Sequence, residues 1–272
     1  MDLGLKGRTA IVFGGSLGIG RAIAAALARE GVALAIAARN AERLEAAAAD
    51  ISAETGTQVL ALPCDVRNRD AVDATVNNAA AELGGLNILI NSGSAPGGSR
   101  TAVGTIDTIV DEDFLADFDT KYLGALRTAR AAIPHLEAAG WGRIVNISGL
   151  NARIAGNLSG GARNTSLVHF TKTLANQLGR RGITVNCIHP GITRTERTPG
   201  MLAARADRQD STPEAVEAAD YAEGAPRANA IGRMIDAAEI ADLTVFLCSE
   251  KAWCVTGETI AADGGGSNAV YY

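Results

Sequence analysis

Gly14-Gly15-Ser16-Leu17-Gly18-Ile19-Gly20 follows the apolar run 9–13 and precedes an alanine-rich stretch. A strand, a glycine turn and a helix in this order form a cradle for nucleotide phosphates. Gly14 permits the tight turn, Gly18 lets the backbone approach the phosphates, and Gly20 allows close packing of helix on strand. Backbone N–H groups and the dipole at the start of the helix favour an anion there. A glycine-rich turn is often only a turn, but the flanking strand and helix favour phosphate binding. The residues expected to contact the nucleotide are Gly14, Ser16, Leu17, Gly18, Ile19 and Gly20.

The composition is that of an ordinary globular protein and disfavours several function classes. The 272-residue chain is 47% hydrophobic and 20% charged, with a formal net charge of -5. A negative balance without a basic stripe argues against nucleic acid as a partner. No apolar run reaches the roughly 18 residues that a membrane span needs, and the N-terminus lacks a signal-peptide core. The three histidines are scattered and indicate no metal site. We expect a cytoplasmic protein with no membrane contact and free, buried cysteines.

Short apolar runs alternate with alanine-rich stretches along nearly the whole chain. The predicted strands are 9–13, 32–38, 58–62, 86–91, 142–148, 183–189 and 258–262. The predicted helices are 18–30, 41–54, 68–83, 111–139, 157–180 and 236–249. This alternation predicts an α/β, doubly wound (Rossmann) fold with a parallel seven-stranded sheet and helices on both faces. The strands are continuously apolar, as expected when both faces are covered. No linker interrupts the pattern, so we predict a single domain over residues 1–272.

One stretch, residues 192–235, breaks this rhythm because it is rich in charge, proline and alanine. It follows the sixth predicted strand and therefore lies at the carboxyl edge of the sheet, where ligands bind in doubly wound folds. We predict a lid over a substrate; a solvated insertion without such a role is the alternative.

The residues after the second predicted strand indicate which nucleotide binds. An NAD site usually carries a carboxylate there for the adenosine ribose, but this chain has Arg39-Asn40. Arg39 can pair with a 2′-phosphate through charge-assisted hydrogen bonds. The sequence therefore predicts NADP(H) in preference to NAD(H), unless Arg39 merely caps a surface turn. Asp65-Val66 closes the third strand and can place Asp65 against an adenine amino group.

Several segments in the same order resemble the short-chain dehydrogenase/reductase family, and the similarity covers almost the whole chain. They are the glycine turn, Asp65-Val66, Ile90-Asn91-Ser92-Gly93, 142–148, 182–186, Pro190-Gly191 with Thr195, and Gly257 with Asp263-Gly264-Gly265. The resemblance implies that Asn91, Ser92 and Gly93 line the adenosine ribose. It also implies that Pro190, Gly191, Ile192 and Thr195 approach the nicotinamide.

At the positions of the family's catalytic side chains, the resemblance does not hold. Family members oxidise or reduce a carbonyl or alcohol carbon with an Asn, a Ser, a Tyr and a Lys. Counted from the matching segments 171–175 and 182–183, the Tyr position falls on Gly160 and the Lys position on Asn164. The Ser position falls on Gly149, one residue after Ser148, and the Asn position falls on Lys121. All four positions depart from the family pattern.

Three residues are candidates for the missing chemistry. Lys121 and Asn164 resemble a reciprocal exchange, which keeps a cation near the pocket and leaves Asn164 to hold the cofactor ribose. Ser148 can bond the substrate oxygen if the short loop after it shifts inward. A lysine with its ordinary pKa of about 10.4 is a poor acid at neutral pH unless burial or another cation lowers that pKa. A structural lysine without a chemical role is the alternative. The pocket around 149–160 is rich in glycine (Gly149, Gly156, Gly160, Gly161), which predicts extra room where the Tyr ring lies in the family.

These residues leave two hypotheses about function. The first is an NADP(H)-dependent oxidoreductase that acts on a small-molecule carbonyl or alcohol through a non-standard proton donor. The second is a non-catalytic NADP(H)-binding protein, either a sensor or an inactive partner in an oligomer. The helices 111–139 and 157–180 resemble those that form subunit contacts in the family, which implies a homotetramer or, failing that, a dimer.

Overall fold

The apolar runs form one parallel sheet of seven strands in the computed structural model, which describes residues 2–94, 104–267 and 270. The strands are β1 (Thr9–Phe13), β2 (Ala33–Ala38), β3 (Val59–Pro63), β4 (Ile88–Asn91), β5 (Gly142–Ile147), β6 (Ile183–Pro190) and β9 (Thr259–Ala262). Their order is β3-β2-β1-β4-β5-β6-β9, so the direction of winding reverses between β1 and β4. This order confirms the predicted doubly wound fold, and the reversal point is where such sheets bind ligands.

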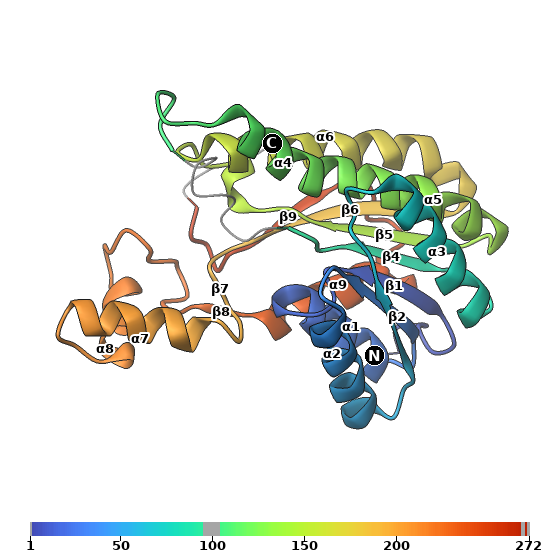
Figure 1. Ribbon diagram of the computed structural model, residues 1–272, viewed down its shortest axis with the longest axis horizontal. Helices are drawn as coiled ribbons and strands as arrows, with labels where there is room; N and C mark the ends of the chain where they lie inside the picture. Colours follow the sequence, from blue (N-terminus) through green and yellow to red (C-terminus); the bar gives the residue numbers. More distant parts are fainter. Residues whose placement is uncertain (1, 95–103, 268–269, 271–272) are drawn as a thin grey trace.

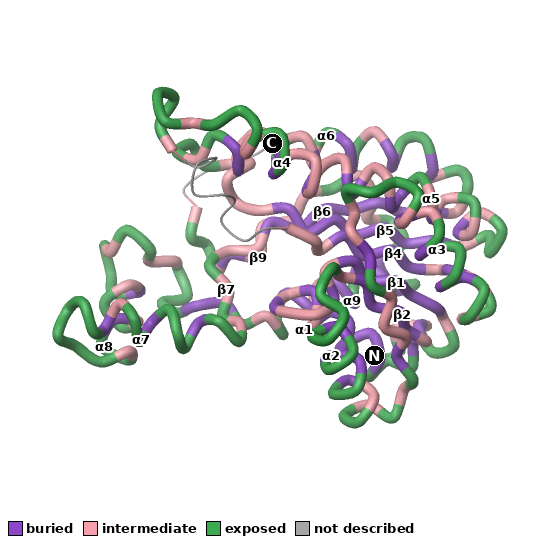
Figure 2. Tube along the Cα trace, viewed as in Figure 1, coloured by how far each residue is buried: buried purple, intermediate pink, exposed green. Residues whose placement is uncertain are grey.

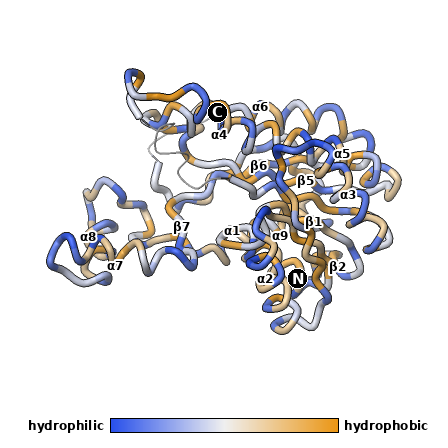
Figure 3. The backbone as a smooth tube through the Cα atoms, in the orientation of Figure 1, coloured by the Kyte–Doolittle hydropathy of each residue, from blue (hydrophilic) through white to orange (hydrophobic). Residues whose placement is uncertain are grey.

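Helices cover both faces of the sheet (Figure 1). They are α1 (Gly18–Arg29), α2 (Ala41–Thr55), α3 (Arg69–Leu83), α5 (Gly124–Ala138), α6 (Leu158–Leu178) and α9 (Ala237–Cys248). One core lies between the sheet and α1, α2 and α9, and the other lies under α3, α5 and α6. β1, β2, β4, β5 and β6 are buried along most of their length (Figure 2), and Figure 3 shows strong hydrophobic character at β1 and β2. A sheet covered on both faces explains why its strands are apolar throughout.

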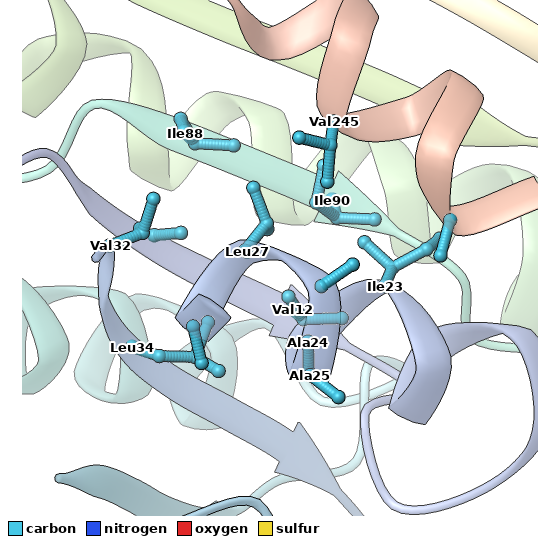
Figure 4. Packing of buried hydrophobic residues seen from close by; sticks show 14 of the residues in the cluster. Val12, Ile23, Ala24, Ala25, Leu27, Val32, Leu34, Ile88, Ile90 and Val245 are labelled. Atoms are coloured by element: carbon cyan, nitrogen blue, oxygen red, sulfur yellow. The ribbon is translucent and has the colours of Figure 1, made fainter. Parts of the chain in front are cut away.

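Small side chains bring α1 close to the sheet. Ala24 and Ala25 are buried in this helix, and Ile23 and Leu27 are fully buried beside them. Figure 4 shows these residues packed with Val12, Ile90 and Val245, which come from β1, β4 and α9. The alanine-rich stretches of the sequence are therefore contact surfaces between helix and sheet.

The predicted helix 111–139 is wrong in one respect, because it is interrupted. It divides into α4 (Asp111–Phe118), a π-helical turn at Asp119–Leu123, and α5. The wider turn buries Lys121, whose Nζ reaches the carbonyl of Ile147 at the end of β5. Hydrophobic periodicity does not reveal one extra residue in a turn, and π-turns often occur at functional sites.

Residues 192–235 form a small unit of their own at the carboxyl edge of the sheet (Figure 1). It contains α7 (Thr198–Arg208) and α8 (Pro213–Asp220), and β7 (Thr193–Arg194) pairs with β8 (Ile235–Asp236) at its base. Leu202, Ala206 and Val216 form a separate apolar cluster between the two helices. This unit is thus locally ordered. The expectation of buried cysteines holds for three of them, while Cys254 is exposed.

A chain of buried polar side chains runs over one face of the sheet, between α5 and α6. Thr128 Oγ1 donates to Asn91 Oδ1 at 2.6 Å, Asn91 Nδ2 donates to Asn146 Oδ1 at 2.9 Å, and Asn146 Nδ2 donates to Thr171 Oγ1 at 2.9 Å. These bonds join α5, β4, β5 and α6 inside an otherwise apolar layer. Buried hydrogen bonds of this kind fix the relative positions of the elements because leaving a partner unpaired is costly.

We expect Thr128→Val to lower the free energy of unfolding by about 1–3 kcal/mol, because it removes a donor to the buried Asn91 carbonyl oxygen. Urea denaturation measures this loss, with an unchanged m-value. Thr244→Val is the matched control: Thr244 is also fully buried, but its hydroxyl donates only to Ile240 of its own helix. An equal loss of unfolding free energy in both variants contradicts the role of these polar side chains in holding α5, β4, β5 and α6 together.

Candidate functional site

The carboxyl ends of the strands and the 192–235 unit enclose a cleft of about 1220 Å³. It lies at the reversal point between β1 and β4. The structure brings most predicted site residues together in its lining. These are Gly14, Ser16, Leu17, Gly18, Ile19, Gly20, Arg39, Asn40, Val66, Ser92, Gly93, Lys121, Ser148, Pro190, Gly191, Ile192 and Thr195. Three predicted residues, Asp65, Asn91 and Asn164, do not line it.

The geometry of the glycine turn explains its sequence. Gly14 and Gly18 have left-handed backbones, with φ of 82° and 56°. A Cβ on Gly20 would lie 2.2 Å from the Gly14 carbonyl oxygen, so only glycine lets α1 begin here. Leu17, at the N-cap, offers no side-chain acceptor. The Gly18 N–H instead donates to Glu196 Oε2 at 3.0 Å, so the turn already holds an anionic group.

The cleft has a strongly positive lining. Its cationic side chains are Arg39, Arg43, Lys121, Arg197, Arg205 and Arg227, and no Asp or Glu is among the described residues that line it. Asp220 neutralises part of this charge from behind, because it pairs with Arg205 and with Arg227. A cleft with this charge and this glycine turn fits the phosphates of a dinucleotide.

Two exposed arginines mark the end of the cleft beside β2. Arg39 follows the strand directly, and Arg43 lies one helical turn later. Asn40 lies between them, and its Oδ1 caps α2 by accepting from the Arg43 N–H at 2.8 Å. No carboxylate of a described residue occupies this part of the lining, so the residues present fit a 2′-phosphate better than a ribose that needs an acidic partner.

The three predicted residues outside the lining have other contacts. Asp65 forms a hydrogen-bonded ion pair with Arg67, with 2.6 Å between Oδ2 and Nη2, and this bond lowers the pKa of the carboxyl group. The Asn91 side chain belongs to the chain of buried polar side chains between α5 and α6. The Asn164 side chain is buried beside Gly149, and its Oδ1 has no hydrogen-bond partner in the described part of the chain.

Among the described residues that line the cleft, Lys121 is the one buried cation. Only 6% of it is exposed, and its Nζ donates to the carbonyl oxygens of Ile147 at 2.6 Å and Ser148 at 3.5 Å. Burial, and next the positive charge of Arg163, lower the pKa of Lys121 to about 7. Arg163 is itself buried and pairs with Asp117 at 2.8 Å. Lys121 is therefore divided between its charged and neutral forms near neutral pH.

The space beside Ser148 differs from the expectation. Ser148 lies on the same wall as Lys121, and its Oγ donates to the backbone carbonyl of Asn164 at 3.2 Å. At Gly160, the position that the resemblance gives to the Tyr, the predicted extra room is taken up, because a Cβ there would lie 2.5 Å from Asn151 Nδ2 and 2.9 Å from Asn157 Cγ. Amide side chains fill this place.

Sequence reasoning missed the cleft residues contributed by the 192–235 unit. They are Thr193, Arg197, Thr198, Met201, Leu202, Arg205, Arg227 and Met234. The sequence contains a pattern that could have indicated some of these residues. Arg197, Met201 and Arg205 follow one another at intervals of four and therefore share one face of a helix. Arg43 and Thr120 also line the cleft and were not singled out.

Two further features concern residues 2–94, 104–267 and 270. None of the helices in this part of the chain is long and apolar enough to cross a membrane. Likewise, the described side chains include no group of three or more His, Cys, Asp or Glu residues that could hold a metal ion.

Comparison with known proteins identifies the family. Residues 14–267 match the family model described as enoyl-(acyl carrier protein) reductase. The chain is 33% identical over 269 residues to the NADPH-dependent reductase BacG of Bacillus subtilis, covering 97% of this chain and 99% of that protein. It is 34% identical over 257 residues to 3-oxoacyl-[acyl-carrier-protein] reductase of Bos taurus, covering 93% and 95%. The structure of L-sorbose reductase from Gluconobacter frateurii, complexed with NADPH and L-sorbose, superposes with a TM-score of 0.91 at 30% identity, covering 99% of this chain and all of that one. The chain belongs to the short-chain dehydrogenase/reductase family.

Proposed function

We propose that this protein is an NADP(H)-dependent oxidoreductase that acts on a carbonyl or alcohol carbon of a small molecule, with Lys121 as its proton donor. The observation that carries the proposal is a buried lysine on the wall of the cleft that also contains the glycine turn. Relatives described as NADPH-dependent, or complexed with NADPH, support the cofactor. Arg39 and Arg43 support a preference for the 2′-phosphate form.

In this proposal the chain's own residues manage charge and proton, and the bound NADPH supplies the hydride. Negative charge develops on a carbonyl oxygen during reduction. The Lys121 ammonium gives its proton to that oxygen, becomes a neutral amine, and regains a proton from solvent. In alcohol oxidation the neutral amine accepts the proton instead. A pKa of about 7 makes both forms available, which is the condition for efficient general acid–base catalysis.

Ser148 and Asn164 have supporting roles in the proposal. The Ser148 hydroxyl reaches the substrate oxygen when it gives up its bond to the Asn164 carbonyl. Because Asn164 lies outside the cleft lining, we assign it a positioning role through Ser148 in place of a contact with the cofactor ribose.

A second function, binding NADP(H) without catalysis, is favoured by one observation. By the resemblance, the family's Tyr and Lys positions fall on Gly160 and Asn164, and amide side chains lie next to Gly160. Such a protein would act as a sensor or as an inactive partner in an oligomer. NADPH binding by calorimetry, combined with no turnover of a broad panel of ketones, alcohols and activated alkenes, distinguishes this function from the first.

The lid role of residues 192–235 and the homotetramer also belong to the proposal. The lid is supported by the side chains that this unit contributes to the cleft. The oligomer rests on the resemblance of the helices around α5 and α6 to family contacts, and light scattering after size exclusion tests it.

The first prediction concerns the pH dependence of ketone reduction. We expect kcat/KM with NADPH to be constant below pH 7 and to fall about tenfold per pH unit above it, because only the ammonium form of Lys121 donates a proton. Lys121→Met should lower kcat by about 10²–10⁴-fold. Lys121→Arg keeps the positive charge but does not titrate, so its residual rate should not depend on pH in this range. Full activity in Lys121→Met excludes lysine as the donor.

The second prediction concerns stability. The pKa of Lys121 is about 7 in the folded protein, whereas the ordinary value, which applies to the unfolded chain, is 10.5. Between these pH values the unfolded chain therefore binds more protons than the folded protein. Wild-type stability should therefore rise with pH across this window, and this contribution should be absent in Lys121→Met. At pH 7 we expect Lys121→Met to be more stable by roughly 1–4 kcal/mol. Lys251→Met, at an exposed lysine, should change stability by less than about 0.5 kcal/mol. Urea denaturation at pH 7 and pH 10 measures both variants, and a less stable Lys121→Met at pH 7 contradicts the buried-charge argument.

The third prediction concerns the cofactor. We expect Arg39→Asp to weaken NADPH binding by about 10–100-fold, because it removes charge-assisted bonds to the 2′-phosphate, and to leave NADH binding unchanged or stronger. Titration calorimetry with both nucleotides measures the change. Arg130→Asp, at an exposed arginine of α5, controls for net charge and should leave both affinities unaltered. Equal weakening of NADPH and NADH by Arg39→Asp excludes a 2′-phosphate contact.

A further inference from the structure

An acidic side chain is hydrogen-bonded to the glycine turn from just outside the cleft lining. Glu196 Oε2 accepts the Gly18 N–H at 3.0 Å, although the two residues are 178 positions apart in sequence. Helix α1 has no acidic residue in its own first turn and no side-chain cap from Leu17. The carboxylate therefore supplies the anionic partner that this helix start lacks.

The stretch around Glu196 lies directly against the glycine turn. A Cβ on Gly18 would lie 3.4 Å from Thr195 Cγ2 and 4.0 Å from Arg197 Nη2. Thr195 and Arg197 both line the cleft, and Arg197 forms no ion pair within residues 2–94 and 104–267. Arg197, the residue after Glu196, is thus a cation whose guanidinium can bind a phosphate that enters the cleft.

We propose that Glu196 is a built-in competitor of the cofactor's pyrophosphate, and that cofactor binding expels its carboxylate from the Gly18 N–H. This inference rests on the proposed function, because it takes the glycine turn as the pyrophosphate site. A carboxylate and a pyrophosphate require the same donor at the start of α1, and their like charges prevent them from sharing it. Arg197, one residue on, then pairs with the phosphate.

The exchange couples the cofactor to the wall of the substrate pocket. Glu196 lies between β7 and α7, and the Thr195 N–H donates to Thr198 Oγ1 at 2.9 Å at the start of α7. Helix α7 carries Met201 and Leu202 into the cleft. When Glu196 leaves the turn, the start of this helix is released from α1, so the cofactor sets the position of residues that face the substrate.

Titration calorimetry with NADPH and with inorganic pyrophosphate tests the proposal. We expect Glu196→Ala to bind both ligands about tenfold more tightly than wild type, because no carboxylate has to be displaced. Glu196→Gln keeps a neutral acceptor and should lie between the two. Glu223→Ala removes the same charge from an exposed position of the same unit and should match wild type. Equal tightening in Glu196→Ala and Glu223→Ala overturns the proposal, because it reports general electrostatics only.

Hydrogen exchange of the peptide that contains Gly18 provides an independent readout. In the absence of cofactor, we expect faster exchange in Glu196→Ala than in wild type, since the amide has lost its acceptor, and equal protection in both with saturating NADPH. Unchanged exchange in the cofactor-free variant overturns the contact.

The two proposals fail in different ways. If wild type and Glu196→Ala both bind no NADPH, NADH or pyrophosphate, the proposed function fails. If wild type binds NADPH and Glu196→Ala binds it with the same affinity, only the competitor role of Glu196 fails.

Discussion

Exclusion of water from the Lys121 ammonium is the constraint on which the chemistry of this cleft depends. The π-helical turn between α4 and α5 directs the side chain against the end of β5, where two backbone carbonyls accept its protons. These carbonyls do not balance a full positive charge, and Arg163 adds a second one nearby. Burying the Lys121 ammonium therefore lowers the stability of the protein and also weakens the binding of the proton to the amine. A weakly bound proton is what a general acid needs.

The buried ion pair beside this lysine makes the arrangement tolerable. Asp117 neutralises Arg163 and also accepts a hydrogen bond from Ser159, so α4 and α6 are joined by satisfied charges. Removing the carboxylate would leave two buried cations together, which is far costlier than one. In the proposed mechanism, a single lysine whose pKa is lowered by burial takes the place of two family residues, the tyrosine and the lysine that lowers the tyrosine's pKa.

The sequence predicted those features that depend on local pattern and backbone conformation. Continuous apolar runs predicted the strands, and the glycine turn and Arg39 do line the cleft, where their cofactor contacts stay predictions. Side-chain direction was not predictable in the same way. Asn91 directly precedes the cleft residue Ser92 along the chain, and Asn164 packs beside Gly149, but both side chains are buried outside the cleft lining, and Thr128 binds the first of them. A motif fixes the position of a residue in the backbone, and only packing decides which face its side chain reaches.

The balance of charge around the cleft also follows from packing. The described part of its lining carries six cations, while two acids lie just outside that lining: Asp220 pairs with Arg205 and Arg227, and Glu196 binds the glycine turn. Without counter-charges, clustered arginines repel one another in the cofactor-free protein. Asp220 is held in a bidentate pair with Arg205 and remains in place, whereas Glu196 is exposed and makes a single bond to a backbone amide. Of these two acids, Glu196 is the one that an incoming phosphate can displace at small cost, because its carboxylate returns to water when the bond breaks.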